Sequence, residues 1–182
     1  MAVALNIGRF LMLGWALYSL VLIFFPRMVN HAPDPKAGAI QFAVAYGIGW
    51  ADPAEIDALN ILQATFLAMR RAVLALPVAA RELRIDGNRL PECADLNRPR
   101  ARAIVGGDGS EACIGAASIL AKTVRDAYMD HAHSIYPSYR FSEHKGYPTA
   151  AHRQALIEHG PCPLHRRSYA PVREILSLQS PP

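Results

Sequence analysis

The sequence predicts an α/β fold, in which a layer of strands packs against helices. Large and small residues alternate strictly over residues 42–50, which is the period of a strand. Apolar residues then recur at helical spacing. Two short apolar runs, Leu83–Ile85 and Ala103–Val105, are each followed closely by a glycine and an aspartate. The 182 residues, of which 52% are hydrophobic and 19% charged, predict one globular domain and exclude a disordered chain.

The strand over residues 42–50 has two unlike faces. One face is large, with Phe42, Val44, Tyr46, Ile48 and Trp50, and the other is small, with Ala43, Ala45, Gly47 and Gly49. A face of alanine and glycine allows a helix or a neighbouring layer to approach the strand closely.

A helix is expected to begin directly after this strand. Asp52-Pro53-Ala54-Glu55 offers an N-cap aspartate, a proline at the first helical position and a glutamate that can bond back to the cap. Pro77 is expected to end the helix. Its apolar residues follow one another at spacings of three and four and form a core-facing stripe: Leu59, Leu62, Phe66, Met69, Val73 and Leu76.

The rest of the chain predicts two buried strands and two further helices. The strands cover Leu83–Ile85 and Ala103–Val105, separated by a surface loop. A helix then opens at Ser110 and runs to about Ser134, with a small inner face of Ile114, Ala117, Ser118, Ala121 and Val124. The last clear helix spans Ala150–His159, capped by Thr149 and ended by Gly160-Pro161.

The first 38 residues read as an apolar leader and linker ahead of a domain over residues 39–182. Phe10–Phe25 is uncharged and resembles a membrane segment, although it is slightly shorter than the roughly 17 to 25 residues of a spanning helix. Any membrane contact would run through residues 7–25. A signal peptide is disfavoured because no small-residue cleavage site follows. A replaced or wrongly chosen start is a third alternative.

Charge and cysteines narrow the partners and the compartment. The net charge is +4, and the excess of Lys and Arg concentrates between Lys145 and Arg173, with His144, His152, His159 and His165 in or directly beside this stretch. Such a positive field suits a polyanion, and a solvated basic surface is an equally good interpretation. The three cysteines, Cys93, Cys113 and Cys162, form no CxxC pair, so we expect free thiols rather than disulfides or a zinc site.

Two aspartates are candidates for chemistry. Asp86 and Asp108 each emerge at the end of a predicted strand beside glycine. Carboxylates at strand ends can converge on one cleft, where hard oxygen ligands hold Mg²⁺ or Mn²⁺. By themselves they could equally be turn residues or helix caps.

Five segments together resemble bacterial ribonuclease HII, in that family's order and spacing. They are DPAEIDALNILQATFLAMRRAV (52–73), IDGN (85–88), GAASILAKTVRD (115–126), HKGYPT (144–149) and HRRSYAPV (165–172). The resemblance covers most of residues 39–173. It implies a ribonuclease H-like mixed sheet flanked by helices, with a helical C-terminal part that helps hold a hybrid duplex.

The resemblance also implies roles for single residues. Asp86 and Asp108 match the family's third and fourth metal-binding carboxylates, and Tyr147 matches the tyrosine that stacks where a ribonucleotide meets DNA. Positively charged residues that could contact phosphates, or be ordinary surface charges, are Lys122, Arg125, Arg166 and Arg167. The implied enzyme is a cytoplasmic monomer that uses Mn²⁺ or Mg²⁺ in two-metal hydrolysis of RNA/DNA hybrids or of duplex DNA containing ribonucleotides, giving 5′-phosphate ends.

The sequence departs from the family at its start. The first two carboxylates of the family lie in an Asp-Glu-x-Gly-Arg-Gly segment on the first strand, and no such segment occurs here; the only acid before Trp50 is Asp34. Gly106 also stands where the family usually has lysine. We therefore expect an N-terminally truncated sheet without its central strands, which the non-alternating run Phe10–Phe25 is poorly patterned to replace, and an impaired enzyme. The alternative is a non-catalytic nucleic-acid-binding remnant, with or without a membrane tether.

Overall fold

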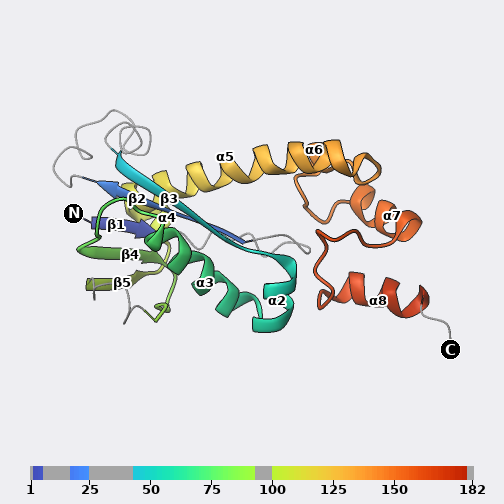
Figure 1. Cartoon of the computed structure of the whole chain (residues 1–182), viewed down its shortest axis with the longest axis horizontal. Coiled ribbons are helices and arrows are strands. Elements are labelled where there is room, and N and C mark those ends of the chain that lie inside the picture. The colour runs from blue at the N-terminus through green and yellow to red at the C-terminus, as the bar shows by residue number, and fades with distance from the viewer. Residues whose placement is uncertain (1, 6–16, 25–42, 93–99, 180–182) are drawn as a thin grey trace. The chain divides into compact units, whose positions relative to one another are not determined.

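A five-stranded mixed sheet forms the first part of the molecule. The computed structural model describes residues 2–5, 17–24, 43–92 and 100–179. The strand order is β3-β2-β1-β4-β5. The strands are β1 Ala2–Leu5, β2 Leu17–Phe24, β3 Ala43–Ala51, β4 Glu82–Asp86 and β5 Arg100–Ile104. β1 pairs antiparallel with β2 and parallel with β4, and β4 pairs parallel with β5, as Figure 1 shows.

The expectation that the sheet lacks its central strands is wrong. Ala2–Leu5 and Leu17–Phe24 supply the two strands between β3 and β4. Alternation was a poor test, because strands covered on both faces read as nearly continuous apolar runs. No helix among the described residues is long and apolar enough to cross a membrane, and the remainder of the run Phe10–Phe25 lies outside those residues. The boundary at residue 38 also lies outside them and stays a prediction.

The helices follow the predicted order. They are α2 Pro53–Leu59, α3 Ile61–Leu74, α4 Gly107–Ser110, α5 Ala112–Ile135, the 3-10 helix Pro137–Tyr139, α6 Phe141–His144, α7 Ala150–His159 and α8 Ala170–Gln179. The predicted cap and bounds of α7 are confirmed, since Thr149 Oγ1 accepts from the backbone N of His152 at 3.2 Å. The predicted end of α5 before Tyr136-Pro137 is also confirmed.

The single helix predicted from Asp52 to Pro77 is in fact two helices. The predicted capping box of Asp52 and Glu55 is present at the start of α2. Asn60 then interrupts the helix with φ +71°, and its side chain accepts from the backbone N of Leu62 and of Gln63 at 3.0 and 3.2 Å. Because asparagine tolerates positive φ and bonds local backbone, it ends α2 and caps α3 in one residue.

The chain forms two compact units, and the first holds the sheet. The small face of β3 meets α3 as predicted: a Cβ on Gly47 or Gly49 would lie 2.3 or 2.1 Å from a backbone oxygen of α3. Within the predicted stripe Met69 is fully buried, and it packs with Leu83 and Ile85 of β4. Leu59 does not belong to this stripe, because it lies on α2 and is 42% exposed.

The first turns of α5 pack on the opposite face of the sheet. The predicted inner residues Ile114, Ala117 and Ala121 are buried and contact Ile48 and Ile104. The prediction of a second buried strand is wrong, because β5 lies at the end of the strand order and its residues are half-buried or exposed. An edge strand has a neighbour on one side only, so its arginines reach solvent.

The second unit is helical. α6, α7, α8, the 3-10 helix and the C-terminal half of α5 belong to it. Its core combines apolar residues with three buried histidines: Met129, Ala132, Tyr139, Phe141, Ala155, Leu156 and Val172, with His144, His152 and His165.

Candidate functional site

Asp86 is the last residue of β4, and its carboxylate is tied to the turn after β5. Oδ1 of Asp86 accepts a hydrogen bond of 2.9 Å from the backbone N of Gly107. Gly87, with φ +119°, turns the chain away from the sheet and donates to the carbonyl of Ile104 at 2.9 Å. The half-buried carboxylate is therefore held at the end of the parallel pair β4–β5.

Two glycines, Gly106 and Gly107, allow the backbone to form this hydrogen bond with Asp86. Gly106 has φ +67° and ψ 29°, a left-handed conformation that glycine adopts without strain. A Cβ on Gly107 would lie 2.6 Å from Cδ1 of Ile114, so a side chain at residue 107 would push against α5. Asp108 follows directly in the first turn of α4 and is exposed. The carboxylate of Asp86 is thus bonded to Gly107, the residue that precedes Asp108 in the sequence.

The other acids beside β4 are paired with arginines. Glu82 accepts from Arg102 at 2.9 Å and from Arg84 at 3.1 Å, and these bonds hold the pKa of Glu82 below its usual range despite partial burial. Arg84 also bonds Glu111 at 2.8 Å. These two glutamates therefore neutralise the arginines of β4 and β5.

Asp86 and Asp108 fit part of a divalent-metal site. Carboxylate oxygens are the ligands that Mg²⁺ and Mn²⁺ prefer, and Mg²⁺ is often held by one or two carboxylates together with substrate phosphates. Within the described residues, however, no group of three or more His, Cys, Asp or Glu is arranged to hold a metal ion. The role of Asp86 and Asp108 as metal ligands therefore stays a prediction, and two carboxylates would leave most of an ion's coordination to other groups.

Tyr147 and Arg125 form a stacked pair in the helical unit. The guanidinium carbon of Arg125 lies 4.8 Å from the centroid of the Tyr147 ring, and Nη1 lies 3.5 Å from its hydroxyl. Arg125 is only 7% exposed and bonds Asp126 at 3.0 Å. Its predicted role as a phosphate contact stays a prediction, and the observed geometry makes it a support for the tyrosine ring.

Three of the four histidines in and beside the basic stretch, His144, His152 and His165, are buried, whereas His159 is exposed. Burial lowers the pKa of His152 and of His165 to about 4, and it also lowers the pKa of His144. They therefore add no charge near pH 7, and the field between Lys145 and Arg173 is carried by lysine and arginine. Their buried contacts around Tyr147 were missed, although each lies in or beside a segment that resembles the family.

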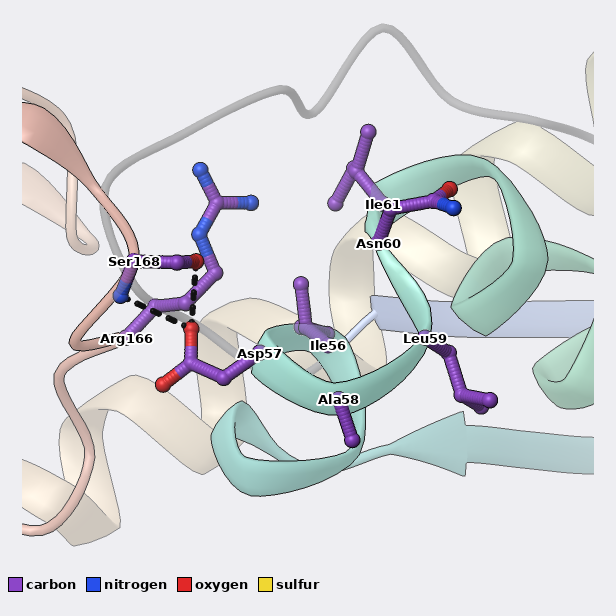
Figure 2. A pocket seen from close by; sticks show the side chains of 8 residues that line it. All are labelled: Ile56, Asp57, Ala58, Leu59, Asn60, Ile61, Arg166 and Ser168. Carbon is purple, nitrogen blue, oxygen red and sulfur yellow. Dashed lines mark hydrogen bonds between the residues drawn. The ribbon is translucent and has the colours of Figure 1, made fainter.

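Arg166 and Arg167 lie on a turn that α2 holds in place. Asp57 accepts from the backbone N of Arg167 and Ser168 at 2.7 and 3.0 Å and from the Ser168 hydroxyl at 2.5 Å. Burial alone would raise the pKa of Asp57, but these hydrogen bonds and the charge of Arg166 outweigh it and lower the pKa. Arg166 lines a pocket of about 330 Å³ beside this turn, whereas Arg167 is exposed, and Figure 2 shows the Asp57–Ser168 bonds.

The remaining residues discussed from the sequence are Lys122 and the three cysteines. Lys122 is exposed on α5, in the unit that holds the sheet. The thiols of Cys113 and Cys162 are free as predicted, and burial raises the pKa of both, to about 11 for Cys162. Cys93 lies outside the described residues.

Solved structures define the fold class as ribonuclease H-like. Ribonuclease H2 from Pyrococcus horikoshii OT3 superposes with a TM-score of 0.73 at 17% identity, covering 97% of this chain and 98% of that one. A ribonuclease HIII, Bst-RNase HIII in complex with Mn²⁺, superposes with a TM-score of 0.66 at 13% identity, covering 97% of this chain and 70% of that one. The predicted fold class is confirmed.

Sequence comparison identifies the family. The family model described as Ribonuclease HII matches residues 38–172, so the chain belongs to the ribonuclease HII family. Ribonuclease HII of Halorhodospira halophila is 58% identical over 155 residues, covering 82% of this chain and 77% of that protein. Ribonuclease HII of Maricaulis maris is 62% identical over 130 residues, covering 71% of this chain, and the chain spans 58% of that protein's length.

Proposed function

We propose that the chain binds RNA/DNA hybrids and duplex DNA containing ribonucleotides, and hydrolyses the phosphodiester bond at the ribonucleotide. Asp86 and Asp108 hold Mn²⁺ or Mg²⁺, which when bound activates water and stabilises the leaving oxygen. Tyr147 stacks at the junction between ribonucleotide and DNA. Lys122, Arg125, Arg166 and Arg167 contribute the positive field that attracts the phosphates.

One observation carries this proposal: the 2.9 Å bond from Gly107 N to Oδ1 of Asp86. This bond joins Asp86, at the end of β4, to Gly107, the residue directly before Asp108 on α4. A fixed first ligand is what a metal-dependent hydrolase requires, because the ion must be held before the phosphate arrives. The Mn²⁺ in the structure of Bst-RNase HIII agrees with the choice of metal.

We further propose that this chain of 182 residues is an impaired enzyme. β1 pairs with β4 up to Leu5–Ile85, one residue before Asp86, yet β1 is Ala-Val-Ala-Leu and the first acid in the sequence is Asp34. The sheet strand beside Asp86 therefore brings no carboxylate to this end of the sheet. Two metal ions would meet about half of the compensating charge of a four-carboxylate site, and the cleavage rate should fall by orders of magnitude.

The test is cleavage of a DNA duplex with one embedded ribonucleotide, with enzyme in excess and either Mn²⁺ or Mg²⁺. We expect slow cutting that leaves a 5′-phosphate, and a loss of roughly 10- to 100-fold or more in Asp86→Asn and in Asp108→Asn. Glu158→Gln, an exposed change on α7, is the matched control and should cut like the parent. Cutting that survives Asp86→Asn contradicts the proposed site. Binding with a steep salt dependence and no cutting would instead identify a non-catalytic binding protein.

A further inference from the structure

A chain of buried hydrogen bonds runs from Cys162 to the backbone of Tyr147. The backbone N of Cys162 lies 3.1 Å from Nδ1 of His165, and Nε2 of His165 lies 3.1 Å from Nε2 of His152. Nδ1 of His152 in turn lies 3.1 Å from the carbonyl oxygen of Tyr147. His152 is 0% exposed and His165 is 3% exposed, so these contacts form away from solvent.

The direction of every proton in this chain is determined by its two ends. The amide of Cys162 can only donate, so Nδ1 of His165 accepts and its proton sits on Nε2. The carbonyl of Tyr147 can only accept, so Nδ1 of His152 carries the proton and its Nε2 accepts. The two Nε2 atoms therefore form one donor–acceptor pair, and both rings are neutral.

A third histidine closes the turn around Tyr147. The ring of His144 stacks on that of His152 with centroids 4.4 Å apart. Its Nδ1 accepts from the backbone N of Gly146 at 3.2 Å, and its Nε2 donates to the carbonyl of Tyr139 at 2.7 Å. The backbone N of Tyr147 donates to the carbonyl of His144 at 2.7 Å. The turn that carries the tyrosine is thus bonded on both sides to buried imidazoles.

We propose that His152, oriented by His165 and Cys162, is a positioning residue that sets the Tyr147 ring against Arg125. The proposal rests on the proposed function, because it assigns the stacking surface to Tyr147. The carbonyl bonded by His152 belongs to the same residue whose ring lies 4.8 Å from the Arg125 guanidinium. Fixing that backbone on one side and the ring on the other leaves a single orientation for an aromatic platform. Such a platform favours a distorted ribonucleotide junction over plain duplex DNA.

The test compares the binding of two duplexes that differ by one ribonucleotide. Both are measured in Ca²⁺, so that the readout is binding and does not depend on cleavage. The variants are His152→Leu, which loses the bond to Tyr147, and His152→Asn, whose amide can donate to the same carbonyl. His159→Leu, at the exposed end of the same helix, is the matched control. The readout is the ratio of the two Kd values, because partial unfolding weakens both complexes equally and leaves the ratio unchanged.

We expect His152→Leu to lower the preference for the ribonucleotide duplex by roughly five-fold or more, the range of one base–aromatic stack. His152→Asn should restore most of it, and His159→Leu should not change it. An unchanged ratio in His152→Leu, or a loss that His152→Asn does not restore, overturns the positioning role.

A second measurement separates this proposal from the proposed function. If the parent chain binds both duplexes equally, the junction-binding role of Tyr147 fails, and NMR then decides the positioning role alone. The imidazole spectra should show the Nδ1–H form for His152 and the Nε2–H form for His165. The ring signals of Tyr147 should shift in His152→Leu and return in His152→Asn. Other tautomers, or Tyr147 signals that ignore both changes, overturn the proposal.

Discussion

Lowering the pH from 7 to 5 should destabilise the helical unit through two buried histidines, His152 and His165. Burial lowers the pKa of both from 6.5 to about 4 in the folded chain. Each ring also uses one nitrogen as an acceptor, and protonation of that nitrogen would break its bond. At a pH between about 4 and 6.5, these histidines bind protons in the unfolded chain but not in the folded chain. The free energy of unfolding therefore falls as the pH falls through 6.5, and it levels off below about 4.

The size of the effect follows from the two pKa values. A histidine with a pKa of about 4 when folded and 6.5 when unfolded loses about 2 kcal/mol of stability at pH 5. The pair therefore loses about 4 kcal/mol, out of the roughly 5–15 kcal/mol of a typical domain. The titratable groups packed against the pair are His144, Cys162 and Tyr139, and Glu143, Arg140 and His133 act on His144. His144, with its own lowered pKa, adds to the loss.

Urea unfolding of the full chain at pH 7, 6 and 5, followed by circular dichroism, measures this loss. Asp57 and Glu82 have pKa values below their usual range, so their contributions are lost only at lower pH and do not enter this window. His152→Asn should reduce the loss between pH 7 and 5 by about half, while His159→Asn should leave it unchanged. A stability that stays flat over this range, or a slope that survives His152→Asn, would refute the reasoning.

Further changes test the rest of the structure. Gly107→Ala should cost about 1–3 kcal/mol in thermal unfolding, because its Cβ would lie 2.6 Å from an isoleucine methyl of α5, whereas Gly109→Ala has nothing within 4 Å and should be nearly neutral. Asp57→Ala removes three hydrogen bonds to the turn before α8 and should cost about 1–3 kcal/mol, measured by urea unfolding. Leu5→Asp adds a carboxylate at the β1 residue that pairs with Ile85, and cleavage of the ribonucleotide duplex should accelerate; an unchanged rate in a folded variant would contradict the proposed cause of impairment.

Local signals predicted the elements that depend on neighbours in sequence. The capping box at Asp52, the cap at Thr149 and the glycine after α7 each act within a few residues, and all three are observed. The helix break at Asn60 was not predicted, because the apolar residues keep their helical spacing on both sides of it. That continuous stripe outweighed a single polar residue. The observed break shows that one side chain bonding local backbone can divide a helix without disturbing the spacing on either side.

The position of Asp86 at the end of a strand could be predicted from sequence, but the support of Tyr147 could not. A short strand pattern followed by a turn with a glycine is enough to recognise Asp86 in the sequence. The bond between His152 and His165 joins residues 13 apart, on either side of a helix end, and a histidine looks the same in sequence whether buried or charged. Burial decides its charge, and burial is a property of the folded unit. The positive field between Lys145 and Arg173 is therefore carried by its lysine and arginines rather than by its buried histidines.

The apolar leader shows why period alone cannot separate a membrane segment from a central strand. Strands that are covered on both faces read as nearly continuous apolar runs, so the lack of alternation in Leu17–Phe24 does not exclude a strand, and β2 lies between β1 and β3. Ala2–Leu5 is too short to show any period. Because a sheet accepts an apolar strand at this position, the ribonuclease H-like fold is kept although β1, Ala2–Leu5, contains no carboxylate.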